Sequence, residues 1–518
     1  MRGCHQPILG EQHRCLPLLE GAEERGRNPI PKETNSLTSF FEPRSLAIVG
    51  ASETRNRIGY VLAENMLANR RQGIFKGDVY FVNPNHSQIL GEPCYPKVSD
   101  LPRPAETVLV AIPSILVPEA IEDAGQAGAT AGIVISSGFA EIGNRTLEEE
   151  LVRVASKYDI RILGPNCLGV YDPYTGMDTL FLPETKLLSD GREVVATPRP
   201  RRGTVSLLTQ SGAFGCAALD YMAGPHGIGI RRFVSYGNRC DVTESELLEY
   251  FGMDTKTRVI LTYLEGLSEG RVFIEKAKEI SKKKPIVALK SGRSESGMRA
   301  AASHTAALAG SDQIYQGAFR QAGIIRAQNV EEFFDFARAL AMQPPGLTNN
   351  VAVVTNAGGP GIITTDALEA SGLHVRKFPS RIMSKFSNLK ASKKLLPVLS
   401  GTNPIDLTAE ATSRMFALTL SILLDDPSIG GIVLIALHHA PTILDDAVGM
   451  IAETIEKRTK PVTVCDMGET EMAETMRTMF EKRGIPSFSM PERAARALWA
   501  LIYYGRYLRA HNVTERRG

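Results

Sequence analysis

The chain has 518 residues, which at about 150 residues per domain predicts three or four domains. Apolar residues make up 43%, charged residues 22%, and the formal net charge is +2, so each domain can bury an ordinary core and no basic stripe for nucleic acid or membrane is present. Seven cysteines without a CxxC spacing argue against a disulfide framework or zinc cage and favour a reducing cytoplasm. No apolar run approaches the roughly 18 residues that cross a bilayer. The basic runs 199–202 and 282–284 are interpreted as solvated surface.

The amino-terminal part changes character near residue 45. Residues 1–38 have no clear hydrophobic periodicity and are predicted to form a disordered extension. The apolar run 45–49 then ends in the Gly-Ala-Ser turn 50–52, as a buried strand does before a phosphate-binding turn, and an amphipathic helix follows at 58–70. Strands that end in Gly, Pro, Ser or Asn continue to alternate with helices, which predicts parallel βαβ units with ligands at the carboxyl ends of the strands.

Two further series of alternating strands and helices follow. One begins near residue 203 and ends in a helix at 330–342, before a Pro-Pro-Gly linker at 344–346. The other opens at residue 350 and closes on a helix that contains Trp499. We therefore predict an α/β fold with three consecutive α/β domains. The predicted boundaries are 1–38 for the extension and 39–172, 173–343 and 347–511 for the domains.

Three strand-to-helix junctions are candidate anion sites, at Gly50, at 210–212 and at 358–361. Each places free backbone N–H groups and a positive helix end at the tip of a strand. The first junction departs from GxGxxG, because its next glycine is Gly59, and the acidic residue that binds a ribose about 20 residues later is missing. An NAD(P)-linked oxidoreductase is thus an alternative that the motif disfavours.

Among the nine histidines, His304 in "AASHTAALAGSD" is the one with small neighbours on both sides. On the residues alone it is either an ordinary packed histidine or a group that a sizeable ligand must reach. His438 and His439 follow an apolar strand and are interpreted as satisfied strand-end residues.

An ordered set of motifs extends these readings: "SLAIVGAS", "VNPN", "ISSGFAE", "GPNCLGV", "TQSGAF", "YGN", "YLEG", "SHTAALAGSD", "NAGGPG" and "TNPIDL". From about residue 40 to 510 the chain resembles the alpha subunit of ADP-forming acyl-CoA (acetate–CoA) ligases, in the superfamily of succinyl-CoA synthetase. The resemblance implies an N-terminal Rossmann-like CoA-binding domain followed by two flavodoxin-like, succinyl-CoA synthetase-like domains.

The resemblance also implies where CoA binds. The residues that would line the CoA site are Gly50, Ser52, Asn83, Pro84, Pro113, Ser114, Ser136, Ser137 and Gly138. The turn beside the thioester would be formed by Gly164, Pro165, Asn166 and Cys167. Cys167 invites the role of a nucleophile, but a small residue packed in the turn is the better interpretation, because the family needs no acyl-cysteine.

By the same resemblance His304 is the histidine that carries a phosphoryl group, and Glu265 is the acid that hydrogen-bonds it. A neutral imidazole is nucleophilic near pH 7, which suits that role. Two helix starts would hold the phosphate, and their residues are Gln210, Ser211 and Gly212 on one side and Asn356, Gly358, Gly359 and Gly361 on the other. Two departures from the family are Ala306, where glycine is usual, and Cys216, where succinyl-CoA synthetases have tyrosine.

The expected reaction is acyl-CoA + ADP + phosphate ⇌ acid + CoA + ATP, through an acyl-phosphate and a phosphohistidine. The three series leave no room for an ATP-grasp domain, so the resemblance implies an ATP-grasp beta subunit as partner, in an α2β2 assembly, with ADP/ATP and Mg²⁺ bound mainly there and no metal held by this chain. A non-catalytic CoA-binding regulatory protein of the same superfamily is the second alternative.

Overall fold

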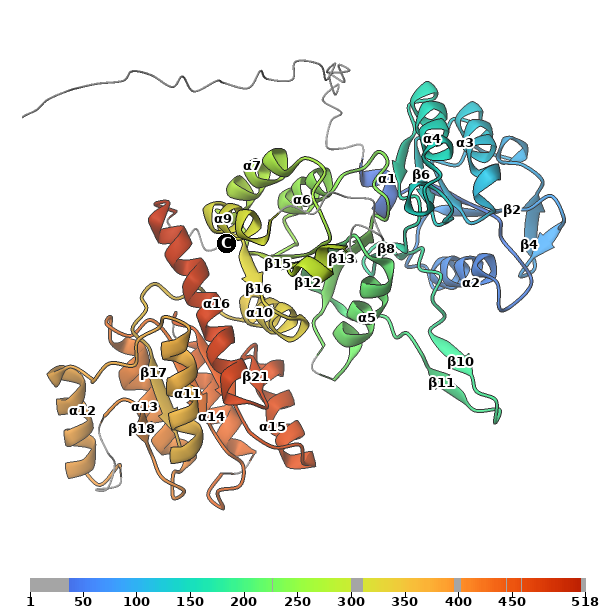
Figure 1. Ribbon diagram of the computed structural model, residues 1–518. Coiled ribbons are helices and arrows are strands. Elements are labelled where there is room, and N and C mark those ends of the chain that lie inside the picture. Colours follow the sequence, from blue (N-terminus) through green and yellow to red (C-terminus); the bar gives the residue numbers. More distant parts are fainter. Residues whose placement is uncertain are drawn as a thin grey trace, which may run out of the picture. The chain divides into compact units, whose positions relative to one another are not determined.

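The computed structural model describes residues 37–225, 227–299, 311–395, 402–443, 445–457 and 459–513. The predicted extension therefore lies outside the described residues except for Leu37, which is buried, and Thr38, which begins a short helix. His304 and Ala306 also lie outside them. The described chain builds three mainly parallel sheets covered by helices, which confirms the predicted fold class (Figure 1). None of the described helices has the length and apolar character that a membrane span needs.

The first sheet contains seven strands in the order β3-β4-β2-β1-β5-β6-β7. β3 pairs with β4 in antiparallel fashion, and the other six strands are parallel in the Rossmann order 3-2-1-4-5-6. The strands are β1 (Ser45–Val49), β2 (Asp78–Val82), β3 (Gln88–Ile89), β4 (Glu92–Tyr95), β5 (Thr107–Val110), β6 (Ala131–Val134) and β7 (Arg161–Leu163). The helices are α1 (Thr38–Phe41), α2 (Ile58–Arg71), α3 (Val117–Gln126) and α4 (Arg145–Lys157), with single turns η2 (Val98–Asp100), η3 (Ser114–Leu116) and η4 (Ala140–Ile142).

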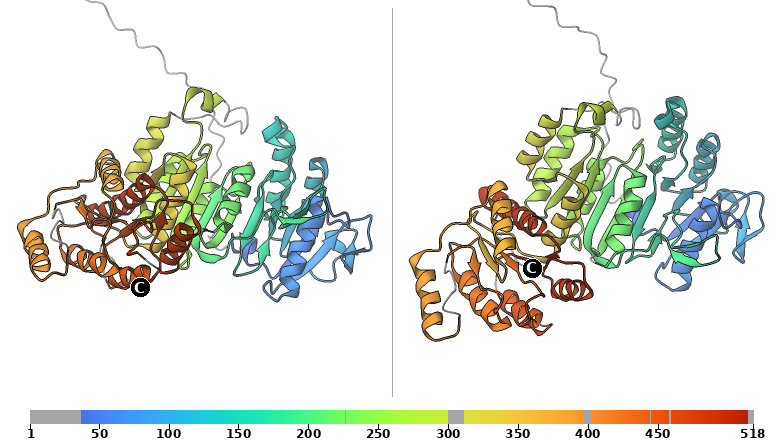
Figure 2. Two further views of the ribbon diagram at one scale, coloured as in Figure 1. Left: turned by 90° about the horizontal axis from the view of Figure 1, so that it is seen from below. Right: turned by 60° about the horizontal axis from the view of Figure 1, so that its bottom comes forward.

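The two faces of this sheet pack against different helices, because side chains alternate along each strand. On β1, Leu46 and Ile48 belong to one buried cluster, whereas Ala47 and Val49 belong to another. The first cluster includes residues of α2 and the second includes residues of α3 and α4. In Figure 2, α2 lies on one side of the sheet, and α3 and α4 lie on the other.

The second sheet has the order β16-β15-β14-β12-β13-β8-β9. Its five parallel strands follow the flavodoxin order 2-1-3-4-5, and β8 and β9 extend it as antiparallel strands beside β13. The strands are β8 (Gly169–Asp172), β9 (Met177–Asp178), β12 (Arg202–Thr209), β13 (Ile230–Ser235), β14 (Val259–Leu264), β15 (Ile286–Lys290) and β16 (Ile325–Ala327). Figure 1 shows α6 (Glu244–Met253), α7 (Gly270–Ser281) and α9 (Asp312–Ala322) on one side, with α5 (Gly212–Ala223) and α10 (Val330–Met342) on the other. Because β8 joins this sheet, the strand pairing changes sheets a few residues before the predicted boundary.

The third sheet repeats the flavodoxin order, as β18-β17-β19-β20-β21, with all pairs parallel. The strands are β17 (Ala352–Thr355), β18 (Ile405–Asp406), β19 (Ile432–Ile435), β20 (Val462–Cys465) and β21 (Ser487–Phe488). The helices are α11 (Gly358–Ala370), α12 (Ser380–Ala391), α13 (Ser413–Asp425), α14 (Asp446–Glu456), α15 (Glu471–Lys482) and α16 (Pro491–Ala510). One buried cluster joins the sheet to α12–α15, and another joins it to α11 and α16.

One basic residue in each of the two basic runs is less solvated than predicted. Between β9 and β12 the chain forms an isolated hairpin of β10 (Thr185–Leu187) and β11 (Glu193–Val195), and Arg199 follows it. The Arg199 side chain is 8% exposed, and its Nε lies 2.6 Å from Asp178 Oδ2. Lys284 is half-buried and donates to the backbone oxygens of Phe251 and Asp254. The surface interpretation is therefore wrong for these two residues, because each basic group finds acceptors that only the folded chain brings together.

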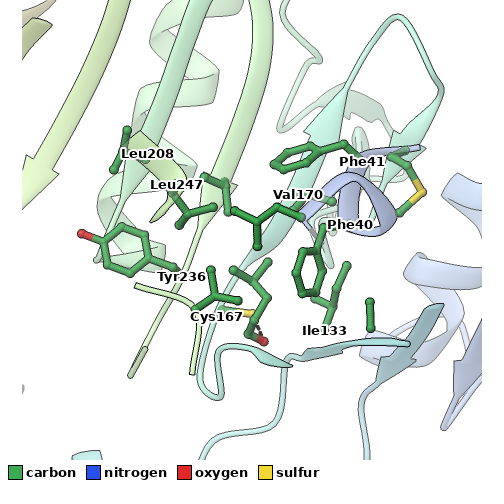
Figure 3. Close-up of a cluster of buried hydrophobic side chains, with 14 of the residues drawn as sticks. Phe40, Phe41, Ile133, Cys167, Val170, Leu208, Tyr236 and Leu247 are labelled. Carbon is green, nitrogen blue, oxygen red and sulfur yellow. Dashed lines mark hydrogen bonds between the residues drawn. The ribbon is translucent and has the colours of Figure 1, made fainter. Parts of the chain in front are cut away.

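A backbone joint connects the first two sheets, formed by residues 162–165 at the end of β7 and residues 237–242 after β13. Three backbone hydrogen bonds make this joint, from Asn238 to Pro165 (2.9 Å), from Cys240 to Gly164 (3.0 Å) and from Val242 to Ile162 (3.1 Å). Arg161 reinforces it, because its guanidinium lies 2.9 Å from Asp241 and 2.8 Å from Glu246. The hydrophobic cluster of Figure 3 continues across the same region and contains residues of both sheets, such as Ile133 and Leu208.

Gly237 permits the close approach at this joint. A Cβ at this position would lie 2.2 Å from Pro165 O, and its φ of +52° is one that side chains rarely adopt. We therefore expect Gly237→Ala to lower the free energy of unfolding by at least about 2 kcal/mol, measured by urea denaturation. Gly270→Ala is the control, since its Cβ would meet no atom within 4 Å. Equal stability of the two variants would contradict the proposed joint.

Candidate functional site

A cavity of about 1450 Å³ lies where the carboxyl ends of the first and second sheets meet. Most of the residues predicted from the sequence line it. From the predicted CoA site these are Gly50, Ser52, Asn83, Pro84, Pro113, Ser114, Ser136 and Ser137, from the thioester turn Asn166 and Cys167, and from the phosphate site Gln210, Ser211, Gly212 and Glu265. Segments more than 200 residues apart in sequence thus share one cavity, as expected for the carboxyl edges of parallel sheets.

Gly50 and Gly59, nine residues apart around the turn after β1, are each required by a close backbone contact. Gly50 has φ +93°, and a Cβ there would lie 2.4 Å from Ala111 O. A Cβ on Gly59 would lie 1.9 Å from Gly50 O, so Gly59 is what lets α2 pack onto the turn. The start of α2 has no side-chain cap, and Arg57, Ile58 and Gly59 line the cavity. Its unpaired backbone N–H groups and positive helix end therefore suit an anionic ligand there.

Two polar residues of the predicted CoA site hold the strand ends together. Asn83 Nδ2 donates to Ala51 O at 2.7 Å, which ties the end of β2 to the turn after β1. Ser136 Oγ donates to Ile112 O at 2.5 Å and accepts from Ile112 N at 3.2 Å, which ties the ends of β5 and β6. The side chains thus fix the loops that form the cavity wall.

The phosphate end of the cavity is built around the start of α5. Ser211 is the N-cap residue, and its Oγ accepts from Phe214 N at 3.2 Å. Gln210 Oε1 accepts from the backbone N–H groups of Glu265 (3.0 Å) and Gly266 (3.2 Å). Gln210 therefore fixes the turn after β14 that carries the half-buried Glu265, next to a positive helix end.

Some predicted residues do not line this cavity. They are Gly138, Gly164 and Pro165, together with Asn356, Gly358, Gly359 and Gly361 in the third domain. Gly138 lies beneath Ser114, whose Oγ would be 2.6 Å from a Cβ on the glycine, and Gly164 and Pro165 belong to the backbone joint. Asn356 exchanges two hydrogen bonds of 3.0 Å with the backbone of Leu437, so it ties β17 to β19 beside the start of α11. A phosphate-binding role for these third-domain residues stays a prediction.

The environment of Cys167 supports a packed rather than a nucleophilic thiol. Its side chain is buried in the cluster that contains Ile133 and Val170 (Figure 3). Its Sγ donates to Val134 O at 3.3 Å, and burial raises the pKa of the thiol to about 12. A thiol that is protonated near pH 7 is a poor nucleophile.

Several cavity residues were not predicted from the sequence. Arg57 and Lys97 supply exposed cations to the wall of the first domain, and Phe181 and Cys216 line the part near α5. Asn238, from the "YGN" motif, donates to Glu141 (2.6 Å) and Glu148 (2.8 Å), and burial raises the pKa of Glu148. The two arginines inside the turn 50–59, Arg55 and Arg57, were a usable signal for a cationic wall, whereas the other residues line the cavity because of which loops meet.

The described residues contain no group of three or more His, Cys, Asp or Glu side chains placed to hold a metal ion. His438 is satisfied, because its Nδ1 lies 2.8 Å from Asp466 Oδ1 and its Nε2 lies 3.2 Å from Thr470 Oγ1. The interpretation of His438 as a satisfied strand-end residue is thus consistent with its contacts.

Three family models match consecutive parts of the chain. A CoA binding domain matches residues 44–173, a succinyl-CoA ligase like flavodoxin domain matches 202–340, and a Ligase-CoA domain matches 351–511. The cavity lies between the parts matched by the first and second models.

Related proteins match nearly the whole chain. The alpha subunit of ADP-forming acetate–CoA ligase I of Pyrococcus furiosus is 37% identical over 92% of this chain and 99% of its own length. ADP-forming acetate–CoA ligase I of Archaeoglobus fulgidus is 37% identical over 92% of this chain, which spans 65% of that longer protein. In fold, the chain matches acetyl-coenzyme A synthetase 1 of Candidatus Korarchaeum cryptofilum, solved with phosphate and ADP, with a TM-score of 0.82, 36% identity, and 92% and 99% of the two chains covered.

Cys167 provides a chemical test of the cavity wall. With a pKa of about 12, only about one part in ten thousand of the thiol is thiolate near pH 8, so we expect iodoacetamide to leave Cys167 unmodified in the folded protein. Cys216 is half-buried and lines the cavity, so it should react faster. Peptide mapping by mass spectrometry measures both rates. Modification of Cys167 as fast as Cys216 would show that the thiol is accessible and ionised.

Proposed function

Because the chain belongs to the family of the alpha subunits of ADP-forming acetate–CoA ligases, we propose that it catalyses acyl-CoA + ADP + phosphate ⇌ carboxylic acid + CoA + ATP together with a partner subunit. One observation carries this proposal: a single cavity joins the strand ends of the CoA binding domain to the start of α5 and to Glu265. Its volume of about 1450 Å³ exceeds the ~300–1,000 Å³ of ordinary ligand pockets and suits a ligand as long as CoA.

In this proposal the first domain binds the nucleotide part of CoA. The positive start of α2 and the cations Arg57 and Lys97 face the phosphates, while the hydroxyls of Ser52 and Ser114 and the backbone of the strand ends supply hydrogen bonds. The thioester then reaches toward Asn166 and Gly212, where the two sheets meet. The acyl group derives from a small carboxylic acid and lies near Phe181 and Cys216.

The chemistry proceeds in two steps on this chain. Phosphate attacks the thioester carbonyl, the C–S bond breaks, and CoA leaves as the thiol while an acyl-phosphate forms. His304 then attacks the phosphorus, the carboxylate leaves, and a phosphohistidine remains. The N–H groups at the start of α5 stabilise the phosphoryl oxygens, and Glu265 orients the imidazole and stabilises its positive charge. Asn356 and the glycines of α11 supply the second set of donors.

The last step transfers the phosphoryl group to ADP on a partner. The relatives named as alpha subunits match this chain along 97–99% of their length, whereas this chain spans only 65% of ADP-forming acetate–CoA ligase I of Archaeoglobus fulgidus. We therefore infer an ATP-grasp beta subunit in an α2β2 assembly, which binds the nucleotide and Mg²⁺. The free thiols of the described cysteines fit a cytoplasmic location. The relatives favour neither an NAD(P)-linked oxidoreductase nor a non-catalytic CoA-binding protein.

The first test follows the phosphoryl group. Incubation with acetyl-CoA and radiolabelled phosphate should release one CoA thiol for each acid-labile, base-stable label on the chain, because histidine phosphate is stable in base. His304→Ala should lose the label completely, and peptide mapping under non-acidic conditions should place it on residue 304. Label on the His304→Ala variant would refute the assignment, and CoA binding without any label would favour the regulatory alternative.

The second test concerns Glu265. We expect Glu265→Gln to slow phosphorylation roughly a hundredfold, since the amide cannot stabilise the imidazolium, while the dissociation constant for CoA measured by calorimetry stays the same. Glu269→Gln is the control, because Glu269 lies on the same turn but does not line the cavity. Equal rates for the two variants would remove Glu265 from the mechanism.

A further inference from the structure

Side chains hold every main-chain polar group of Glu265 and Gly266. Gln210 Oε1 accepts from both N–H groups, Lys290 Nζ donates to Glu265 O at 2.9 Å, and Arg239 Nη1 donates to Gly266 O at 2.8 Å. Three side chains from three different segments thus converge on two peptide groups. Such a turn has little freedom to move, so the position of the Glu265 side chain is set by its neighbours.

Lys290 is the least expected member of this set. It is the last residue of β15, it is 2% exposed, and its ammonium also donates to Ser291 O and lies 4.8 Å from the centre of the Tyr315 ring. Burial lowers the pKa of Lys290, and the nearby negative charge of Asp312 opposes that effect. Methionine would fill the same space without desolvating a charge, so the position is not explained by packing alone.

The contacts that account for the charge are those to the backbone oxygens of Glu265 and Ser291. The ammonium bridges the carbonyl groups of the residues that directly follow β14 and β15, and Ser291 N donates to Leu264 O at 3.0 Å between the same two strand ends. Lys290 does not line the cavity, so it reaches the ligand only through the turn that it holds. We propose that Lys290 is a positioning residue for phosphoryl transfer, which acts by fixing the main chain of Glu265; this inference rests on the proposed function.

The same chain offers a matched control. Lys284 lies just before β15, at its other end, and its ammonium likewise donates to two backbone oxygens, those of Phe251 and Asp254. Burial lowers its pKa as well. Lys284→Met therefore removes a half-buried ammonium that also has two backbone acceptors, without touching the turn of Glu265.

The test measures phosphorylation from acetyl-CoA and radiolabelled phosphate in Lys290→Met, Lys284→Met, Glu265→Gln and the double variant Lys290→Met/Glu265→Gln. We expect Lys290→Met to lower the maximal rate about ten- to a hundredfold with an unchanged KM for acetyl-CoA, as misplacement of a reacting group does. Lys284→Met should keep its rate even if its Tm falls equally. The double variant should be no slower than Glu265→Gln alone, because both substitutions remove the function of the same group, the Glu265 carboxylate.

Two outcomes would overturn the inference while the proposed function stands. One is a rate for Lys290→Met equal to that of Lys284→Met, and the other is a double variant whose loss is the product of the two single losses. If Lys290→Met does not fold, Lys290→Gln replaces it, because the amide keeps one N–H donor for Glu265 O. Its phosphorylation rate is expected to lie between those of the wild type and Glu265→Gln, and it is combined with Glu265→Gln in the same double-variant comparison. If Glu265→Gln is labelled at the full rate, the role of Glu265 in the proposed function is refuted, and this inference with it.

Discussion

The close backbone contact between the turn after β7 and the loop after β13 is the constraint on which the site depends. Two parallel sheets each carry polar residues at their carboxyl edges, but the edges form one cavity only if they face each other. Three backbone hydrogen bonds and the ion pairs of Arg161 hold them so, and the absence of a side chain at Gly237 makes the contact possible. The cavity is therefore a product of the joint, not of either sheet.

The polar side chains at the strand ends act mostly on the protein itself. Asn83, Ser136, Gln210 and Asn356 each use side-chain atoms to hold a neighbouring backbone segment. Besides the side chains of Arg57, Lys97, Ser52 and Ser114 that line the cavity, an anion then meets the backbone N–H groups at helix starts, which need no side-chain ordering when a ligand arrives. The side chains at the strand ends thus keep the loops rigid, and the exposed helix starts bind the ligand.

The periodicity of the sequence was sufficient for the architecture. The predicted helix at 330–342 coincides with α10, and the apolar run 45–49 coincides with β1. The two-residue strands β18 and β21 were not predicted, because so few residues carry no periodicity. The change of sheet at β8 depends on pairing with β13, more than 50 residues away, which no local pattern records.

At the site, the strand-to-helix junction at 210–212 predicted Gln210, Ser211 and Gly212 from the residues themselves, whereas Glu265 was predicted only from the family resemblance that the "YLEG" motif helps to carry. Lys290 was not predicted, because the sequence does not distinguish a buried lysine at the end of an apolar strand from a solvated one. Arg199 misled for the same reason: the partner of a buried cation, here Asp178, is defined only by the folded chain.

The long helix α16 has a consequence for how the protein loses its structure. Its residues Ala494, Leu498 and Leu501 belong to the core of the third sheet, whereas Ala500, Tyr504 and Leu508 belong to the core of the second. One helix thus completes two cores, and neither can be stripped of it without exposing apolar surface in both. Unfolding of the third domain should therefore also destabilise the second domain. For the same reason the two domains should be transferred between proteins together, as one unit.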